Sequence, residues 1–184
     1  MKKTRALAVA LVLAALPLLA ASVDGVKIPD TVTIDGKELK LNGAGVRKKM
    51  IVRVYVLGLY LETPSKDATA IISSDQIKSM QLKMLRNVDG AKISGAIIEG
   101  FENNSKAALP QLKPRLDQLA KMLPDVKEGD VIALTWIPGK GTQVEVRGTM
   151  TGTIEGRDFA DALFAVWLGP NPVQEDLKVA LVGG

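Results

Sequence analysis

The stretch from Leu41 to Glu62, LNGAGVRKKMIVRVYVLGLYLE, constrains the fold of this chain more than any other segment. Val, Leu and Ile occupy both alternating sets of positions in its second half, which is typical of a strand covered on both faces. We therefore expect a central strand over residues 43–62. Arg47 and Tyr55 are unusual in such a run, because a buried guanidinium or hydroxyl needs a polar partner or a polar guest. The Gly43-Ala44-Gly45 turn would let backbone come close to such a guest.

The N-terminal residues have the pattern of a secretory signal peptide. Lys2, Lys3 and Arg5 precede an apolar run over residues 6–19, and the small residues Ala20-Ala21-Ser22 follow it. The run contains a proline and is shorter than the roughly 20 residues needed to span a bilayer. We expect residues 1–22 to be a cleaved signal peptide and residues 23–184 to form one periplasmic or secreted domain. A retained N-terminal anchor is the alternative.

The composition excludes several classes of function. The chain has no Cys and no His, which excludes disulfides, Ser-His-Asp and Cys-His nucleophilic sites and the commonest transition-metal ligand. The net charge of +4 comes largely from the N-terminal segment. The remaining basic residues are dispersed, unlike those of a nucleic-acid-binding protein. We expect no metal, no cofactor, no nucleic-acid partner and no stable membrane span after signal cleavage.

The rest of the pattern predicts strands at both ends of the domain, with helices between and after them. Strands are expected in a hairpin over residues 31–41 and over 77–86, 130–137, 142–147 and 149–154. Helices are expected over 66–73 with Ser65 as cap, 89–103, 109–123 with Pro110 and Pro114 at its start, 157–168 and 176–182. This order indicates an α+β fold with a mainly antiparallel sheet.

Three short motifs follow one another at characteristic distances. They are Gly43-x-Gly45-Val46-Arg47, then Val54-Tyr55-Val56-x-Gly58-Leu59-Tyr60-Leu61, then Phe164-x-x-Trp167-Leu168-Gly169-x-x-Pro172. Together they resemble the chalcone isomerase family, specifically its bacterial, periplasmic chalcone-isomerase-like branch, over roughly residues 27–181. The resemblance implies an open-faced β-sandwich, in which helices cover a mainly antiparallel sheet. The family contains plant isomerases that close a flavanone ring, plastid fatty-acid-binding members and non-catalytic members.

The resemblance assigns a role to Arg47 more clearly than to any other residue. Arg47 matches the arginine that engages the anionic oxygen of a substrate or the carboxylate of a fatty acid. Tyr55 stands where the isomerases hold a threonine, and a tyrosine there is similar to the fatty-acid-binding members. Asp89, Ala96 and Ala160 depart from the polar contacts of the isomerases. The resemblance therefore favours binding over ring closure.

The residues themselves leave alternatives open at both site positions. The Arg47 guanidinium offers a planar donor fork to a carboxylate or enolate, or it pairs with an acidic neighbour such as Glu38. The Tyr55 hydroxyl contacts a ligand or bonds a backbone carbonyl. Tyr60 points to the other face of the strand and is interpreted as structural. Arg53 is expected to pair with an exposed carboxylate such as Glu62 or Asp67, with a role as the site arginine as its alternative.

The leading hypothesis is an exported, non-catalytic protein that binds a fatty acid or similar amphipathic carboxylate through Arg47 and Tyr55. The apolar helix stripes would then be core or would line the cavity. The alternative is an isomerase or intramolecular lyase acting on a chalcone-like or other phenolic enone. In that case Arg47 would stabilise an oxyanion and Tyr55 would move a proton. A third possibility is a structural or partner-binding protein of the cell envelope with a filled core.

Overall fold

A computed structural model describes residues 20–183 of the chain. The strands are β1 (Ala20–Val23), β2 (Val26–Pro29), β3 (Thr31–Ile34), β4 (Lys37–Lys49), β5 (Val52–Leu61), β6 (Lys78–Met84), β7 (Val131–Ile137), β8 (Gly141–Val146) and β9 (Thr149–Ile154). The helices are α1 (Ala68–Ser73), α2 (Gly90–Asn104), α3 (Leu109–Met122), α4 (Arg157–Leu168) and α5 (Glu175–Leu181). All five expected helices and the strands expected over 77–154 are present, whereas the N-terminal strands differ from expectation.

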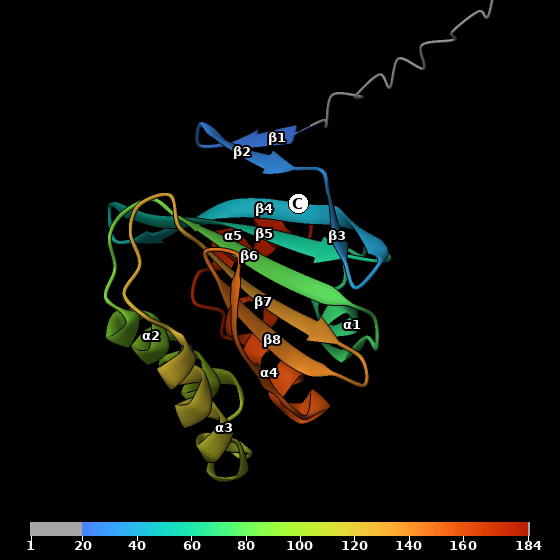
Figure 1. Cartoon of the computed structure of the whole chain (residues 1–184), viewed down its shortest axis with the longest axis vertical. Helices are drawn as coiled ribbons and strands as arrows, with labels where there is room; N and C mark the ends of the chain where they lie inside the picture. Colours follow the sequence, from blue (N-terminus) through green and yellow to red (C-terminus); the bar gives the residue numbers. More distant parts are fainter. Residues whose placement is uncertain (1–19, 184) are drawn as a thin grey trace, which may run out of the picture.

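Strands β3 to β9 form one antiparallel sheet in which each strand pairs with its neighbour in sequence. The helices cover one face of this sheet, with α4 behind β7 and β8 and the α2–α3 pair at one side (Figure 1). The main hydrophobic core lies between the sheet and the helices. This arrangement confirms the α+β open-faced sandwich.

A smaller hydrophobic cluster lies on the other face of the sheet, beneath the separate β1–β2 hairpin. It contains Ile28 of β2 together with Val56 and Tyr60 of β5, all of them buried. The Tyr60 hydroxyl donates to the carbonyl of Pro29 at 3.0 Å. The structural interpretation of Tyr60 is therefore confirmed. The hairpin gives β5 cover on both faces, which explains its nearly continuous apolar sequence.

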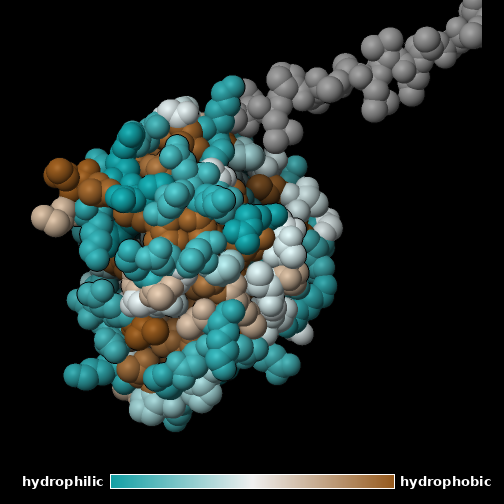
Figure 2. Space-filling model, turned by 60° about the vertical axis from the view of Figure 1, so that its left-hand side comes forward, coloured by the Kyte–Doolittle hydropathy of each residue, from teal (hydrophilic) through white to brown (hydrophobic). Residues whose placement is uncertain are grey.

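The prediction of a single strand over residues 43–62 is wrong, because the chain reverses in the middle of that run. β4 ends at Lys49 and β5 begins at Val52, so Met50 and Ile51 form a two-residue turn. Neither residue is a usual turn former. Their side chains are 93% and 94% exposed, and apolar groups stand out at the left edge of the space-filling view, beyond a largely hydrophilic surface (Figure 2).

The ends of two helices also differ from expectation. Asp67, rather than Ser65, caps α1, and its side chain accepts a hydrogen bond from the backbone nitrogen of Ala70. Pro114 lies inside α3 rather than at its start. Its side chain is exposed, and the helix continues past it because its leucine stripe is buried against the core.

The expected signal peptide lies almost entirely outside the described residues, and only Ala20 to Ser22 fall inside them, at the start of β1. Between residues 20 and 183, no helix is long and apolar enough to cross a membrane.

Candidate ligand-binding site

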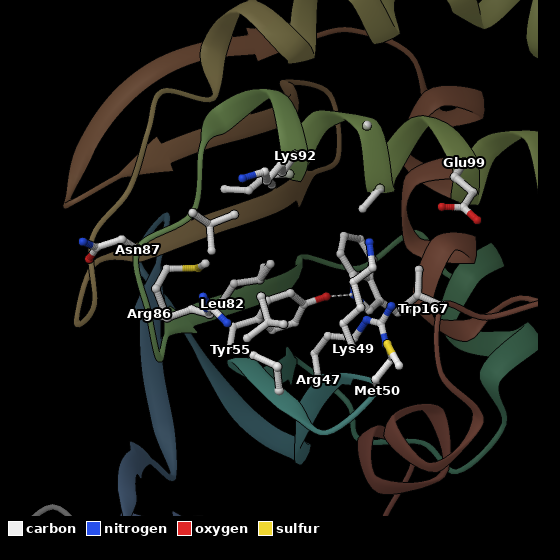
Figure 3. Close-up of a pocket in the computed structure, with 18 residues that line it drawn as sticks. Arg47, Lys49, Met50, Tyr55, Leu82, Arg86, Asn87, Lys92, Glu99 and Trp167 are labelled. Carbon is white, nitrogen blue, oxygen red and sulfur yellow. Dashed lines mark hydrogen bonds between the residues drawn. The ribbon is translucent and has the colours of Figure 1, made fainter.

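A pocket of about 770 Å³ lies between helix α2 and the end of the sheet formed by β4, β5 and β6. Helix α2 runs across one side of the pocket, and the strands form the other side (Figure 3). Much of the wall is aliphatic, and these residues are Val54, Leu82, Met84, Val88, Ile93, Ala96 and Val173. Ile93 belongs to the helix expected over 89–103, and the structure places it at the pocket.

Arg47 and Tyr55 come together in this pocket because they are cross-strand partners on β4 and β5. Directly opposed residues of an antiparallel pair project from the same face of the sheet. The two residues that the sequence indicated as a site are therefore placed side by side by the register of β4 and β5. Both side chains are partly buried, and both point into the pocket (Figure 3).

A β-bulge beside this pair separates Arg53 from the site. Arg47 pairs with Tyr55 but Lys48 pairs with Arg53, which leaves Val54 as the extra residue on β5. The alternation that groups Arg53 with Tyr55 therefore fails at this point. Arg53 pairs instead with Asp24 in the β1–β2 turn, at 2.6 Å. The expected pairing with an acidic residue holds, but the alternative of Arg53 as the site arginine is wrong.

The Arg47 guanidinium has no carboxylate partner in the described part of the chain, and it is not paired with Glu38. Its Nη1 donates to the carbonyl of Lys48 and to Oε1 of Gln174, the latter at 3.3 Å. Oε1 of Gln174 also accepts from the backbone nitrogen of Lys48 at 2.8 Å, and its Nε2 donates to the carbonyl of Val46 at 3.2 Å. The side-chain amide of Gln174 thus forms the hydrogen bonds that a neighbouring strand would form with the edge of β4. It also orients the Arg47 guanidinium.

The Tyr55 hydroxyl accepts a hydrogen bond from Nε1 of Trp167 on α4, at 2.9 Å (Figure 3). Burial raises the pKa of Tyr55, and this effect outweighs the indole hydrogen bond and the nearby positive charge of Arg47, which lower the pKa. The phenol is therefore neutral near pH 7 and keeps its proton as a donor. Its partner is an indole rather than the backbone carbonyl considered from sequence.

Gly43 and Gly45 serve the packing of α5 rather than the approach of a guest. A Cβ atom on Gly43 would lie 2.2 Å from the carbonyl oxygen of Ala180. A Cβ atom on Gly45 would lie 2.9 Å from both Ala180 Cβ and Leu177 Cδ1. The two glycines therefore let α5 lie directly on β4. This contact brings Gln174, just before α5, to the edge of the strand.

The pocket is electropositive. Lys49, Arg86 and Lys92 line it together with Arg47, and Glu99 on α2 is the carboxylate among its described lining residues. The four side chains other than Arg47 are exposed, so they form a charged rim around an aliphatic interior. Such a site favours a ligand with an anionic end and an apolar body.

The three positions that depart from the isomerase pattern have different surroundings. Ala96 lines the pocket. Asp89 lies at the start of α2 and pairs with Lys92 at 2.6 Å, and Ala160 is buried in the main core. None of the three supplies a polar group to the pocket. No group of three or more acidic residues in residues 20–183 is placed to hold a metal ion.

Sequence reasoning missed two contacts at the candidate site, those of Trp167 and Gln174. Trp167 was given no role at the site from the sequence, but its indole nitrogen donates a hydrogen bond to the Tyr55 hydroxyl. Its place in the third family motif was a usable signal. Gln174 lies 127 residues from Arg47, and no pattern in the sequence connects the two.

The molecule is thus an antiparallel sheet covered by helices, with an electropositive candidate pocket at one end of the sheet. The model of the chalcone isomerase-like family matches residues 20–183, and the chain belongs to this family. Among solved structures, the chain is similar to the crystal structure of a fatty-acid binding protein from Arabidopsis thaliana. The TM-score is 0.69 and the identity 13%, over 86% of this chain and 92% of that one. Among curated proteins, no relative matches.

Proposed function

We propose that this protein is a non-catalytic member of the family that binds a fatty acid or a similar amphipathic carboxylate. Arg47 and Tyr55 hold the carboxylate, and the aliphatic wall holds the chain. The observation that carries this proposal is an arginine without a carboxylate partner in the described chain, beside a neutral phenol in a largely apolar pocket. We further propose that it belongs to the bacterial, exported branch, based on the charged and apolar pattern of residues 1–22.

The size and chemistry of the pocket support this proposal. A volume of about 770 Å³ lies within the range of roughly 300–1,000 Å³ typical of small-molecule sites. The guanidinium supplies parallel donors for a carboxylate, and the Tyr55 hydroxyl has a proton to donate because its pKa is raised. The similar Arabidopsis thaliana structure is that of a fatty-acid binding protein, which agrees with this ligand class.

The isomerase alternative has less support. A raised pKa makes Tyr55 a poor general base near neutral pH. The residues at the other expected polar positions, Ala96 and Ala160, carry no polar group, and Asp89 is engaged with Lys92. A ring-closure assay with chalcones discriminates between the two functions, and we expect no turnover above the uncatalysed rate.

The test of the proposal is native mass spectrometry of the purified protein, followed by titration with a fatty acid after delipidation. We expect a co-purified carboxylate and saturable binding by the wild type. Arg47→Ala should lower the affinity about 10- to 100-fold, because a hydrogen bond to a charged group contributes about 1.5–3 kcal/mol. Arg47→Lys should recover only part of the loss, since an ammonium lacks the planar fork.

Arg53→Ala is the matched control. It removes an arginine from the same strand pair, but one that contacts Asp24 away from the pocket. Its affinity should equal that of the wild type. An empty protein without saturable binding, or equal losses in Arg47→Ala and Arg53→Ala, would contradict the proposal.

A further inference from the structure

The β4–β5 turn presents two large apolar side chains to solvent. Met50 and Ile51 are 93% and 94% exposed, and Val52 next to them is 39% exposed. In the space-filling view, apolar side chains stand out from the left edge of the molecule (Figure 2). Single exposed apolar residues are ordinary, but adjacent ones at the tip of a protruding hairpin indicate a contact surface.

The backbone of this turn is unfavourable for its sequence. Met50 has a φ of 56°, in the left-handed region that glycine, asparagine and aspartate occupy most readily. Two-residue hairpin turns usually carry those residues for this reason. Methionine at this position therefore has a local conformational cost and gains no compensating burial within residues 20–183.

Unpaired positive charge lies on the β4 side of the apolar tip, whereas Arg53 on the β5 side is paired with Asp24. No acidic residue lies between Glu38 and Glu62 in the sequence, whereas Arg47, Lys48 and Lys49 directly precede the tip. Lys48 and Lys49 are exposed, and neither forms an ion pair with another residue of the described chain. An apolar tip with unpaired cations at its base is complementary to an anionic lipid surface, where each cation adds attraction to the headgroups and the apolar side chains enter the acyl boundary.

We propose that the β4–β5 turn docks the protein onto an anionic lipid bilayer, with Met50 and Ile51 inserted between headgroups. Met50 and Lys49 also line the candidate pocket, so docking brings the pocket to the bilayer surface. Docking follows from the hairpin itself. Its use for exchanging a lipid ligand with the bilayer rests on the proposed function.

The size of the tip favours a bilayer over a protein partner. A specific protein interface needs roughly 800 Å² from each partner, and two side chains at a narrow turn offer far less. A bilayer requires no complementary shape. The charge of the hairpin also disfavours a second copy of the same chain, because Lys48 and Lys49 would be brought close to their equivalents.

The absence of cysteine allows a probe to be placed at the turn alone. In the full chain, Ile51→Cys is labelled with an environment-sensitive fluorophore and mixed with vesicles of phosphatidylcholine and phosphatidylglycerol. We expect a blue shift with the mixed vesicles, a smaller response with pure phosphatidylcholine, and loss of the response at high salt. Lys48→Gln in the same background should raise the lipid concentration at half response about fivefold.

Met150→Cys with the same label is the matched control. Met150 is an exposed methionine, 45% accessible, on β9 at the far edge of the sheet. Its label should stay aqueous even if the N-terminal segment tethers the chain to the vesicle. A label at position 51 that stays aqueous, or responds like the one at 150, overturns the proposal. A shift that needs no vesicles but grows with protein concentration also overturns it, and it would indicate self-association.

The two proposals fail separately. The vesicle response of the position-51 label requires no ligand in the pocket, and the Arg47 titration requires no vesicle. A normal vesicle response without saturable fatty-acid binding would leave the docking surface in place and remove the proposed ligand.

Discussion

One hydrogen bond connects Tyr55, in the candidate pocket, to helix α4. Its hydroxyl accepts from the buried Trp167 indole, so Tyr55→Phe should leave that N–H without a partner. We expect the free energy of unfolding to fall by about 1–3 kcal/mol, the cost of an unsatisfied buried donor. Affinity for a fatty acid should fall as well. Urea unfolding and ligand titration measure the two effects, and an unchanged stability would show that this hydrogen bond does not contribute.

Lys78 is a second residue whose surroundings predict a measurable effect. Its side chain is fully buried, and Nζ donates to the carbonyls of Ile71, Ile72 and Ser74 at the end of α1. Burial lowers its pKa from 10.5 to about 8, although the nearby Asp161 carboxylate opposes the shift. Between these two values, the unfolded chain binds a proton that the folded chain does not bind.

The free energy of unfolding should therefore rise with pH across that interval. Relative to Lys78→Met, the wild type should gain about 3 kcal/mol between pH 8 and pH 10.5. Below pH 8 the difference between the two proteins should be flat. Urea unfolding of both proteins over this pH range measures it. A difference that falls with rising pH would show that the three carbonyls hold the ammonium charged.

The site residues differed in how readily the sequence revealed them. Arg47 and Tyr55 could be found because polar side chains in an apolar run need a partner. The indole of Trp167 could not be assigned to Tyr55 because the hydrogen bond joins residues 112 positions apart. Lys78, outside the pocket, lies in the strand expected over 77–86, but its carbonyl partners depend on how α1 lies against β6.

Among the secondary-structure elements, the contact between β4 and α5 depends on a glycine. Gly43→Ala would place a methyl group 2.2 Å from the carbonyl oxygen of Ala180. Backbone on both sides of this contact must shift, so we expect a loss of about 1–3 kcal/mol of stability. Chemical denaturation measures the loss.

Gly95→Ala is the control of identical chemistry. A Cβ atom there meets nothing within 4 Å, and alanine favours the helix over glycine by about 1 kcal/mol. Its stability should rise or stay constant. Equal effects of the two substitutions would contradict the packing role of Gly43.

Elements whose apolar residues recur with a clear period were predicted close to their observed bounds. For α4 the predicted and observed bounds are the same, residues 157–168. The β4–β5 turn was missed because its sequence lacks the glycine, asparagine or aspartate that usually marks a reversal. Met50 and Ile51, the two residues of the turn, are also apolar, so nothing in the sequence separated β4 from β5. The bulge at Val54 then changed the side on which Arg53 emerges.

At the scale of the whole molecule, the pocket volume limits the ligand. With about 770 Å³ available, affinity for saturated fatty acids should rise with chain length until the aliphatic wall is covered. Each added CH₂ should strengthen binding about three- to fourfold, from about 0.8 kcal/mol of burial. A series of calorimetric titrations below the micelle concentration measures this slope. Affinity independent of chain length would exclude the aliphatic wall as the binding surface.

The architecture could be predicted from the sequence because the order of strands, helices and family motifs all indicated one fold. The pocket itself could not, since its walls come from β4, β5, β6, α2 and α4. Apolar residues on α2 had two open interpretations, core and cavity. The structure divides them, with Ile97 and Phe101 buried in the core and Ile93 at the pocket.

The side-chain amide of Gln174 has a consequence for association between molecules. β4 pairs with β3 only as far as Lys40. Without Gln174, the later residues of β4 would expose unpaired backbone N–H and C=O groups to another protein molecule. Such open strands are templates for aggregation. Gln174 accepts a hydrogen bond from the backbone nitrogen of Lys48 and donates one to the carbonyl of Val46. These backbone groups at the edge of β4 are therefore not available to another strand, and the same side chain contacts Arg47. We therefore expect Gln174 to limit edge-to-edge association of the protein as well as to hold the Arg47 guanidinium in place.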